Sequence, residues 1–144
     1  MKILFDTCIA IDVLQHREPF WQDSYAAFLT VANRQAEGYL TAKSFTDIYY
    51  LTHRQTHDAA ETRRVLTRLL TIFDLLDTSA ADSRRALASA VSDYEDAVMI
   101  ETAIRSGMDC ILTRNVRDYQ HAPIPVLTPA ALREQLPPVP WGAS

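Results

Sequence analysis

The stretch KILFDTCIAIDVL, residues 2–14, decides the fold of this chain. Residues 3–5 form a short apolar run that indicates a buried strand, and Thr7 can begin a helix directly after it. Asp6 lies at the junction between the two. Because a carboxylate is costly to remove from water without a partner, Asp6 either caps the following helix or belongs to a binding site.

Strand-like and helix-like patterns alternate along the rest of the chain. The patterns predict strands at 2–5, 39–44, 74–79, 109–113 and 124–127, and helices at 7–14, 20–37, 45–56, 59–73, 80–92, 94–106 and from 129 onward. Gly38 is expected to be the stop signal of the helix at 20–37. Such alternation produces parallel βαβ units with helices on both faces of the sheet. We therefore predict an α/β fold with a mostly parallel central sheet. A single domain is expected over 1–136, followed by an irregular, proline-rich tail at 137–144.

Composition excludes several classes of protein. The 144 residues include only three glycines, and no Gly-rich phosphate-binding motif occurs. Cys8 and Cys110 are typical of two free thiols in a reducing cytoplasm rather than of a disulfide framework. No apolar run approaches the length of a membrane span, and no signal peptide is recognised. The net charge of −4 argues against non-specific nucleic-acid binding but permits a local basic patch.

Polar side chains follow two of the predicted strands, where an α/β fold has its ligand site. Asp6 follows the first strand, and Asn115 and Asp118 follow the strand at 109–113. Asp96 begins a predicted helix on the same side as its apolar stripe. Each residue also has a simpler explanation, because acids stabilise helix N-termini and Asn and Asp are common in turns.

Asp47 lies in the predicted helix 45–56 and has two interpretations. Ser44 and Asp47 have the spacing of a capping box, which is a purely structural role. Yet the helical neighbours of Asp47 are Tyr50 and Leu51, which form an apolar side rather than a solvated one. The second interpretation therefore groups Asp47 with the other acids.

A group of carboxylates repels itself, and some members stay protonated unless a cation is present. All-oxygen ligands suit Mg²⁺ or Mn²⁺ rather than zinc. A metal ion held by carboxylates can activate water and stabilise charge on a phosphoryl oxygen. The acids therefore predict a divalent-metal site and the hydrolysis of phosphodiester bonds.

Four segments resemble the PIN-domain ribonucleases, and particularly the VapC-type toxins of bacterial toxin–antitoxin pairs. They are ILFDTCIAIDVL, KSFTDIYYL, YEDAVMIETAIRSGMDCILTRNVRDY and IPVLTPAAL, which occur in the family's order and span nearly the whole chain. The resemblance implies a three-layer α/β/α sandwich and a metal-dependent endoribonuclease using Mg²⁺ or Mn²⁺. It also implies an RNA substrate, a cognate antitoxin protein and a homodimer, in the cytoplasm and without a membrane.

The resemblance assigns roles to individual residues. Asp6, Asp47, Asp96 and Asp118 are the expected catalytic acids, and Asp6, Asp96 and Asp118 are the expected metal ligands. Asp47 stands where most toxin members have a glutamate, so its shorter side chain is expected to act through water. Asn115 stands where many members have an aspartate, and we expect it to orient the site or the substrate as a neutral donor.

Residues near Asn115 are expected to help with orientation. Thr113 can hydrogen-bond one of the acids. Arg114 and Arg117 flank Asn115 and are expected to contact RNA phosphates. A second basic group, at 43–68, is either part of the RNA-binding surface or a solvated helix face.

Three alternatives were compared with the nuclease. A phosphatase that forms an aspartyl phosphate needs a second acid two residues after Asp6, where this chain has Cys8. A receiver domain needs a lysine late in the chain, but the only lysines are Lys2 and Lys43. The third alternative stays open: a catalytically inactive PIN-fold module that binds or regulates. Asp47 and Asn115 keep it open because both depart from the family pattern.

Overall fold

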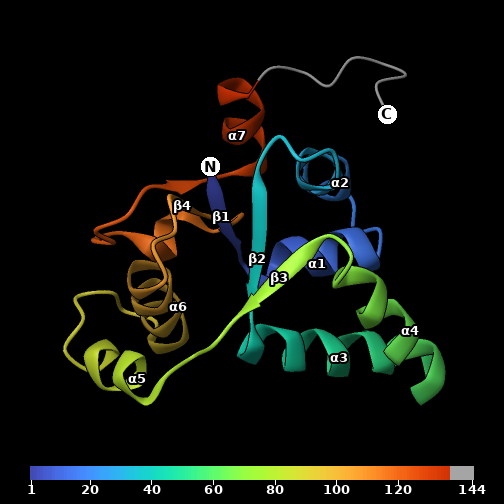
Figure 1. Cartoon of the computed structure of the whole chain (residues 1–144), viewed down its shortest axis with the longest axis horizontal. Coiled ribbons are helices and arrows are strands. Elements are labelled where there is room, and N and C mark those ends of the chain that lie inside the picture. Colours follow the sequence, from blue (N-terminus) through green and yellow to red (C-terminus); the bar gives the residue numbers. More distant parts are fainter. Residues whose placement is uncertain (137–144) are drawn as a thin grey trace.

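The computed structural model describes residues 1–136 and contains a five-stranded parallel sheet between two layers of helices (Figure 1). The strand order is β3-β2-β1-β4-β5, and every pairing is parallel. The strands are β1 Lys2–Phe5, β2 Glu37–Thr41, β3 Phe73–Leu76, β4 Cys110–Leu112 and β5 Val126–Leu127. The predicted α/β/α sandwich with a parallel central sheet is confirmed.

Helices connect successive strands, as parallel pairing requires. The α-helices are α1 Thr7–Leu14, α2 Trp21–Ala32, α3 Ala42–Thr56, α4 Ala59–Leu69, α5 Ala80–Ala86, α6 Tyr94–Arg105 and α7 Pro129–Gln135, and the 3₁₀ helix η1 is Val116–Tyr119. Within residues 1–136, no helix is long and apolar enough to cross a membrane. The tail expected at 137–144 lies outside the described residues.

The central strand β1 contributes to both hydrophobic cores because its side chains alternate between the two faces of the sheet. Ile3 and Phe5 pack with residues of α1–α4 and α7 on one face, whereas Leu4 packs with residues of α5 and α6 on the other. Figure 1 shows these two helical layers on opposite sides of the strands. On the first face, the Phe73 ring packs edge-on against Phe5 and Phe28, with centroids 4.8 Å and 5.0 Å apart.

Gly38 is the clearest correction to the predicted elements. The expected helix 20–37 ends earlier, at Ala32, and Gly38 is not its stop signal but a residue of β2. A Cβ at Gly38 would lie 2.7 Å from Val31 Cγ1 and 2.8 Å from Phe73 Cδ1. The glycine is therefore required by close packing between the strand and its neighbours.

The capping box predicted from Ser44 and Asp47 is also wrong. Helix α3 begins earlier, at Ala42, and its N-cap is Thr41, the last residue of β2. The Thr41 side chain accepts a hydrogen bond from the Ser44 backbone N–H at 3.0 Å. Asp47 is therefore free of a capping role and lies one turn further along α3.

Candidate active site

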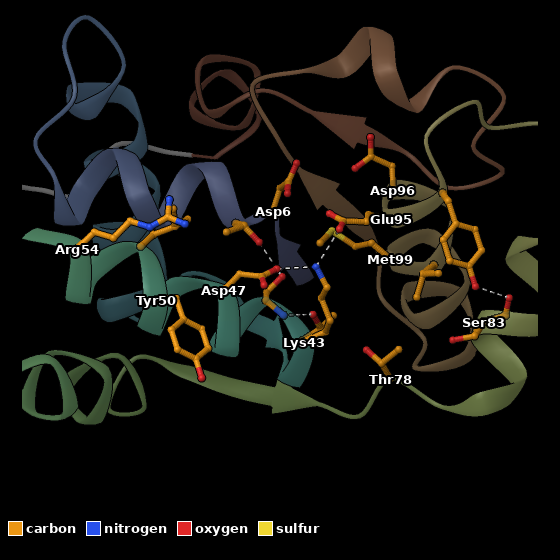
Figure 2. A pocket seen from close by; sticks show the side chains of 16 residues that line it. Asp6, Lys43, Asp47, Tyr50, Arg54, Thr78, Ser83, Glu95, Asp96 and Met99 are labelled. Carbon is orange, nitrogen blue, oxygen red and sulfur yellow. Dashed lines mark hydrogen bonds and ion pairs between the residues drawn. The ribbon is translucent and has the colours of Figure 1, made fainter. Parts of the chain in front are cut away.

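A cavity of about 690 Å³ opens beyond the carboxyl ends of β1 and β2, between α3 and α6 (Figure 2). Asp6, Asp47 and Asp96 line it, together with Lys43 and Glu95. The three aspartates come from three segments: the β1–α1 junction, α3 and the first turn of α6. The structure thus brings three of the four expected catalytic acids to one cavity.

Asp6 occupies the N-cap position of α1, but its side chain makes no capping hydrogen bond. Instead, its Oδ2 atom accepts hydrogen bonds from Thr113 Oγ1 at 2.8 Å and from the Tyr119 hydroxyl at 3.1 Å. The hydrogen bond expected between Thr113 and an acid is therefore present. The capping explanation of Asp6 is wrong, because contacts with distant segments hold this carboxylate.

Asp96 lies in the first turn of α6, where Asp93 is the N-cap and accepts from the Asp96 backbone N–H at 2.9 Å. Burial, which is the largest cause, and the negative charges of Asp6, Asp93 and Asp118 together raise the pKa of Asp96 to about 7. The Tyr119 hydroxyl acts in the opposite direction. Near neutral pH, this carboxyl group is therefore partly protonated unless a cation neutralises its surroundings.

Asp47 differs from the other two acids because it has a basic partner. Lys43, one turn earlier on α3, places Nζ 2.6 Å from Asp47 Oδ2. The same Nζ lies 3.3 Å from Glu95 Oε1, at the start of α6. Figure 2 shows the lysine ammonium between these two carboxylates. The ion pairs connect the two helical walls of the cavity.

The remaining expected residues follow β4. Thr113 is fully buried, whereas Asn115, Arg117 and Asp118 are exposed, the last two on η1. Asp118 is not a lining residue of the cavity, although its charge acts on Asp96. Asp118 therefore lies close enough to Asp96 for its charge to act on that acid, but outside the lining of the cavity.

Arg114 is occupied by a contact that the sequence did not reveal. Its Nε donates to Oδ2 of the fully buried Asp12 at 2.6 Å, and its guanidinium lies 4.0 Å from the centre of the Phe20 ring. The Asp12 carboxylate also accepts from Ser24 Oγ at 3.3 Å. Asp12 is recognisable in sequence as an acid within an apolar helix, but nothing in the sequence indicates a partner 102 residues away.

The acids fit a hard divalent cation by their chemistry. Asp6, Asp96 and Asp118 offer only oxygen ligands, which Mg²⁺ and Mn²⁺ prefer. Burial, followed by the charges of the neighbouring acids, raises the pKa of Asp96, and a bound cation would offset both causes. Among residues 1–136, however, no three acidic, histidine or cysteine side chains are already arranged to hold a metal ion. Binding would therefore require these side chains to rearrange.

The family model of the PIN domain matches residues 2–117, most of the chain. The chain belongs to the PIN domain family. The matched range includes Asp6, Asp47, Asp96 and Asn115 and ends one residue before Asp118. Comparison with curated proteins gave no match.

Solved structures with the same fold include chains of toxin–antitoxin complexes. One, from Klebsiella pneumoniae, is 22% identical with a TM-score of 0.66, over 88% of the present chain and 97% of that chain. Another, VapBC2 from Rickettsia felis, is 14% identical with a TM-score of 0.67, over 89% and 98%. A third is VapC20 from Mycobacterium tuberculosis, described as a toxin that cleaves the sarcin-ricin loop; it is 14% identical with a TM-score of 0.59, over 76% and 86%. At these identities, the similarity establishes the fold.

Proposed function

We propose that this PIN domain is a metal-dependent endoribonuclease that hydrolyses RNA phosphodiester bonds, acting as the toxin of a toxin–antitoxin pair. The observation that carries the proposal is the meeting of Asp6, Asp47 and Asp96, from three segments, in one cavity at the carboxyl edge of the sheet. A carboxyl group with a strongly raised pKa in such a cavity is typical of functional sites rather than of structural ones.

The proposed metal ligands are Asp6, Asp96 and Asp118. When bound, Mg²⁺ or Mn²⁺ lowers the pKa of water and stabilises negative charge on the scissile phosphate and the departing oxygen. Thr113 and Tyr119 fix the orientation of Asp6 through two hydrogen bonds. Burial raises the pKa of the Tyr119 hydroxyl, and the charge of Asp6 raises it further, so this group remains a hydrogen-bond donor.

Asp47 is proposed as the fourth catalytic acid, acting through water rather than as a direct ligand. Asn115 and Arg117 are exposed beside the acids, and we propose that Asn115 orients the RNA and Arg117 contacts a phosphate. Arg114 is proposed to help less directly. Because Asp12 fixes its Nε atom, Arg114 orients the loop that carries Asn115.

The partners are proposed from the related structures. The Klebsiella pneumoniae and Rickettsia felis structures are toxin–antitoxin complexes, and the Mycobacterium tuberculosis protein is described as a toxin that cleaves the sarcin-ricin loop. We therefore propose an antitoxin protein that blocks the cavity and a homodimeric toxin. The cytoplasm is the proposed location, because the RNA substrate and the antitoxin are made there.

The test is cleavage of a mixed RNA pool by purified protein with Mg²⁺ or Mn²⁺, compared with an EDTA control and the Asp96→Asn variant. We expect cleavage that requires the metal and falls at least 100-fold in the variant. Full metal-dependent cleavage by an Asp6→Ala, Asp96→Ala double variant would refute the assignment of these acids.

A PIN-fold module that binds without cutting is the second candidate function. Two observations favour it: Asp47 is paired with Lys43 rather than with the other acids, and no metal-binding group is already formed within residues 1–136. Calorimetry separates the two functions. Binding of RNA without detectable uptake of Mg²⁺ or Mn²⁺, and without cleavage, would favour the module.

A further inference from the structure

Lys43 introduces a positive charge among the acids of the cavity, which Arg54 also lines. It is one of only two lysines in the chain, and the other, Lys2, begins β1 at the opposite edge of the sheet. The Lys43 side chain lies on the cavity wall formed by α3, and Figure 2 shows its ammonium directed toward the acids. A lysine in this place needs an explanation beyond general solubility.

The contacts of Lys43 resemble those of a bound cation. Its Nζ lies 2.6 Å from Asp47 Oδ2 and 3.3 Å from Glu95 Oε1, so one ammonium group forms ion pairs with carboxylates on two helices. Glu95 immediately precedes Asp96, and Lys43 lines the same cavity as two of the proposed metal ligands, Asp6 and Asp96. A divalent ion could reach Asp47 only by displacing the ammonium or by sharing the carboxylate with it.

These ion pairs contribute little to the stability of the fold. The side chains of Lys43, Asp47 and Glu95 are 48%, 41% and 75% exposed, and ion pairs this exposed add little to the free energy of unfolding. A structural role for Lys43 as a clamp between α3 and α6 is therefore weakly supported. A role in setting the charge of the cavity agrees better with its position.

We propose that Lys43 takes the place of a second divalent cation, so that this site binds a single metal ion. This inference rests on the proposed nuclease function and refines it. Lysine is a compact point charge with three N–H donors. Two donors face Asp47 and Glu95, and the third is free to contact an RNA phosphate, where the ammonium stabilises developing negative charge as a second metal ion would.

The test is calorimetric titration with Mn²⁺ of the wild type, Lys43→Met and the matched control Lys2→Met. Both substitutions remove one lysine charge from the chain, but only the first removes it from the cavity. We expect the wild type and Lys2→Met to bind a single Mn²⁺ and Lys43→Met to bind a second one. An added Asp47→Asn substitution in Lys43→Met should abolish the second binding event, because it removes the released carboxylate.

Equal Mn²⁺ stoichiometry in Lys43→Met and Lys2→Met would overturn the inference. Since Lys43 is half-exposed, we expect the variant to fold, and circular dichroism checks this. Lys43→Arg, which keeps the charge, provides a second variant: it should still bind a single Mn²⁺, and a second binding event there would equally overturn the inference.

RNA cleavage provides a readout that separates this inference from the proposed function. The cleavage rate should depend on Mn²⁺ concentration with a Hill coefficient of about 1 in the wild type and approaching about 2 in Lys43→Met. If neither protein cleaves RNA but the stoichiometries differ as expected, the nuclease proposal fails and the inference about Lys43 stands. If both cleave RNA with identical metal dependence and stoichiometry, the inference fails and the nuclease proposal stands.

Discussion

Replacing Asp96 with asparagine is expected to stabilise the metal-free protein at neutral and alkaline pH. Burial, followed by the charge of Asp6, raises the pKa of Asp96 from its ordinary 3.8 to about 7 in the folded chain. In the unfolded chain the group keeps its ordinary pKa. The folded state therefore disfavours the charged form, which is a cost that asparagine does not carry.

The pH range follows from the sign of this shift. Well below its ordinary pKa of 3.8, Asp96 is protonated in both states and costs nothing. As the pH rises toward 7, Asp96 loses its proton in the unfolded state before it does so in the folded state. The free energy of unfolding of the wild type therefore falls over this range and stays constant above pH 7. About three pKa units at about 1.4 kcal/mol each set an upper bound of about 4 kcal/mol. Since Asp96 is only partly buried, screening by solvent reduces the expected difference to about 2 kcal/mol.

The assay is urea unfolding of the wild type and Asp96→Asn in EDTA at about pH 3.5, pH 6 and pH 8. The two free energies of unfolding should agree within about 0.5 kcal/mol at the lowest pH. At the two higher pH values, the variant should be more stable than the wild type. Asp74→Asn is a matched control, because Asp74 is an exposed residue of β3. Saturating Mn²⁺ should stabilise the wild type and have little effect on Asp96→Asn.

Two results would refute this reasoning. The first is a pH-independent difference between Asp96→Asn and the wild type, since a repelled carboxylate must show its effect only where it is charged. The second is a variant less stable than the wild type at pH 8, because it would mean that the charged form is favoured in the fold. Either result would remove the electrostatic argument for a cation at this site.

Three further predictions concern the surroundings of the site. Asp82 is fully buried and paired with Arg105 Nε at 2.9 Å, so Asp82→Asn should lower the free energy of unfolding by about 3 kcal/mol in thermal or urea unfolding. Burial raises the pKa of Asp82, but hydrogen bonds from Arg105, Ser79 and Thr102 together with the charge of Arg105 outweigh it and lower the pKa to about 2. This contribution should therefore be present above pH 4 and lost as pH falls toward 2. Gly38→Ala should cost about 1–3 kcal/mol in the same assay, since its Cβ would lie 2.7 Å from a valine methyl carbon. Tyr119→Phe removes a hydrogen bond to Asp6 and should weaken Mn²⁺ binding about tenfold in calorimetry, with unchanged affinity refuting the orienting role.

The sequence was sufficient for the fold because the apolar runs mark each strand and the residues between them have helical periodicity. It failed where packing between distant segments overrides local pattern. Gly38 resembles a helix stop, but the rings and methyl groups around it require a glycine in a strand. Ser44 and Asp47 have capping-box spacing, but Thr41 already provides the cap. In both cases the sequence contains a pattern that is typical of a helix end or cap, but other residues end or cap the helix in the structure.

The candidate site was predictable where strand ends and nearby helices determine the positions of its residues. Asp6, Asp47 and Asp96 lie in such segments, and the structure brings them together. The ionic partners were not predictable. Lys43 is four residues from Asp47, but its second partner lies on another helix. The partner of Arg114, Asp12, is 102 residues away in sequence. Contacts at such separations depend on the three-dimensional fold and leave no pattern in a single sequence.

The contrast among the buried acids supports the placement of function at Asp96. Asp12 and Asp82 are fully buried, and each has an arginine within 2.9 Å. This is how a folded protein ordinarily accommodates a carboxylate without water. Within residues 1–136, no ion pair involves Asp6 or Asp96, although the two repel each other and burial raises the pKa of Asp96 to about 7. Selection for stability alone would favour an arginine or an apolar residue at such a position. Asp96 is a partly buried acid in a cavity and has no ion-pair partner, whereas Asp12 and Asp82 are each paired with an arginine. This difference supports the proposal that a cation binds at Asp96 from outside the chain.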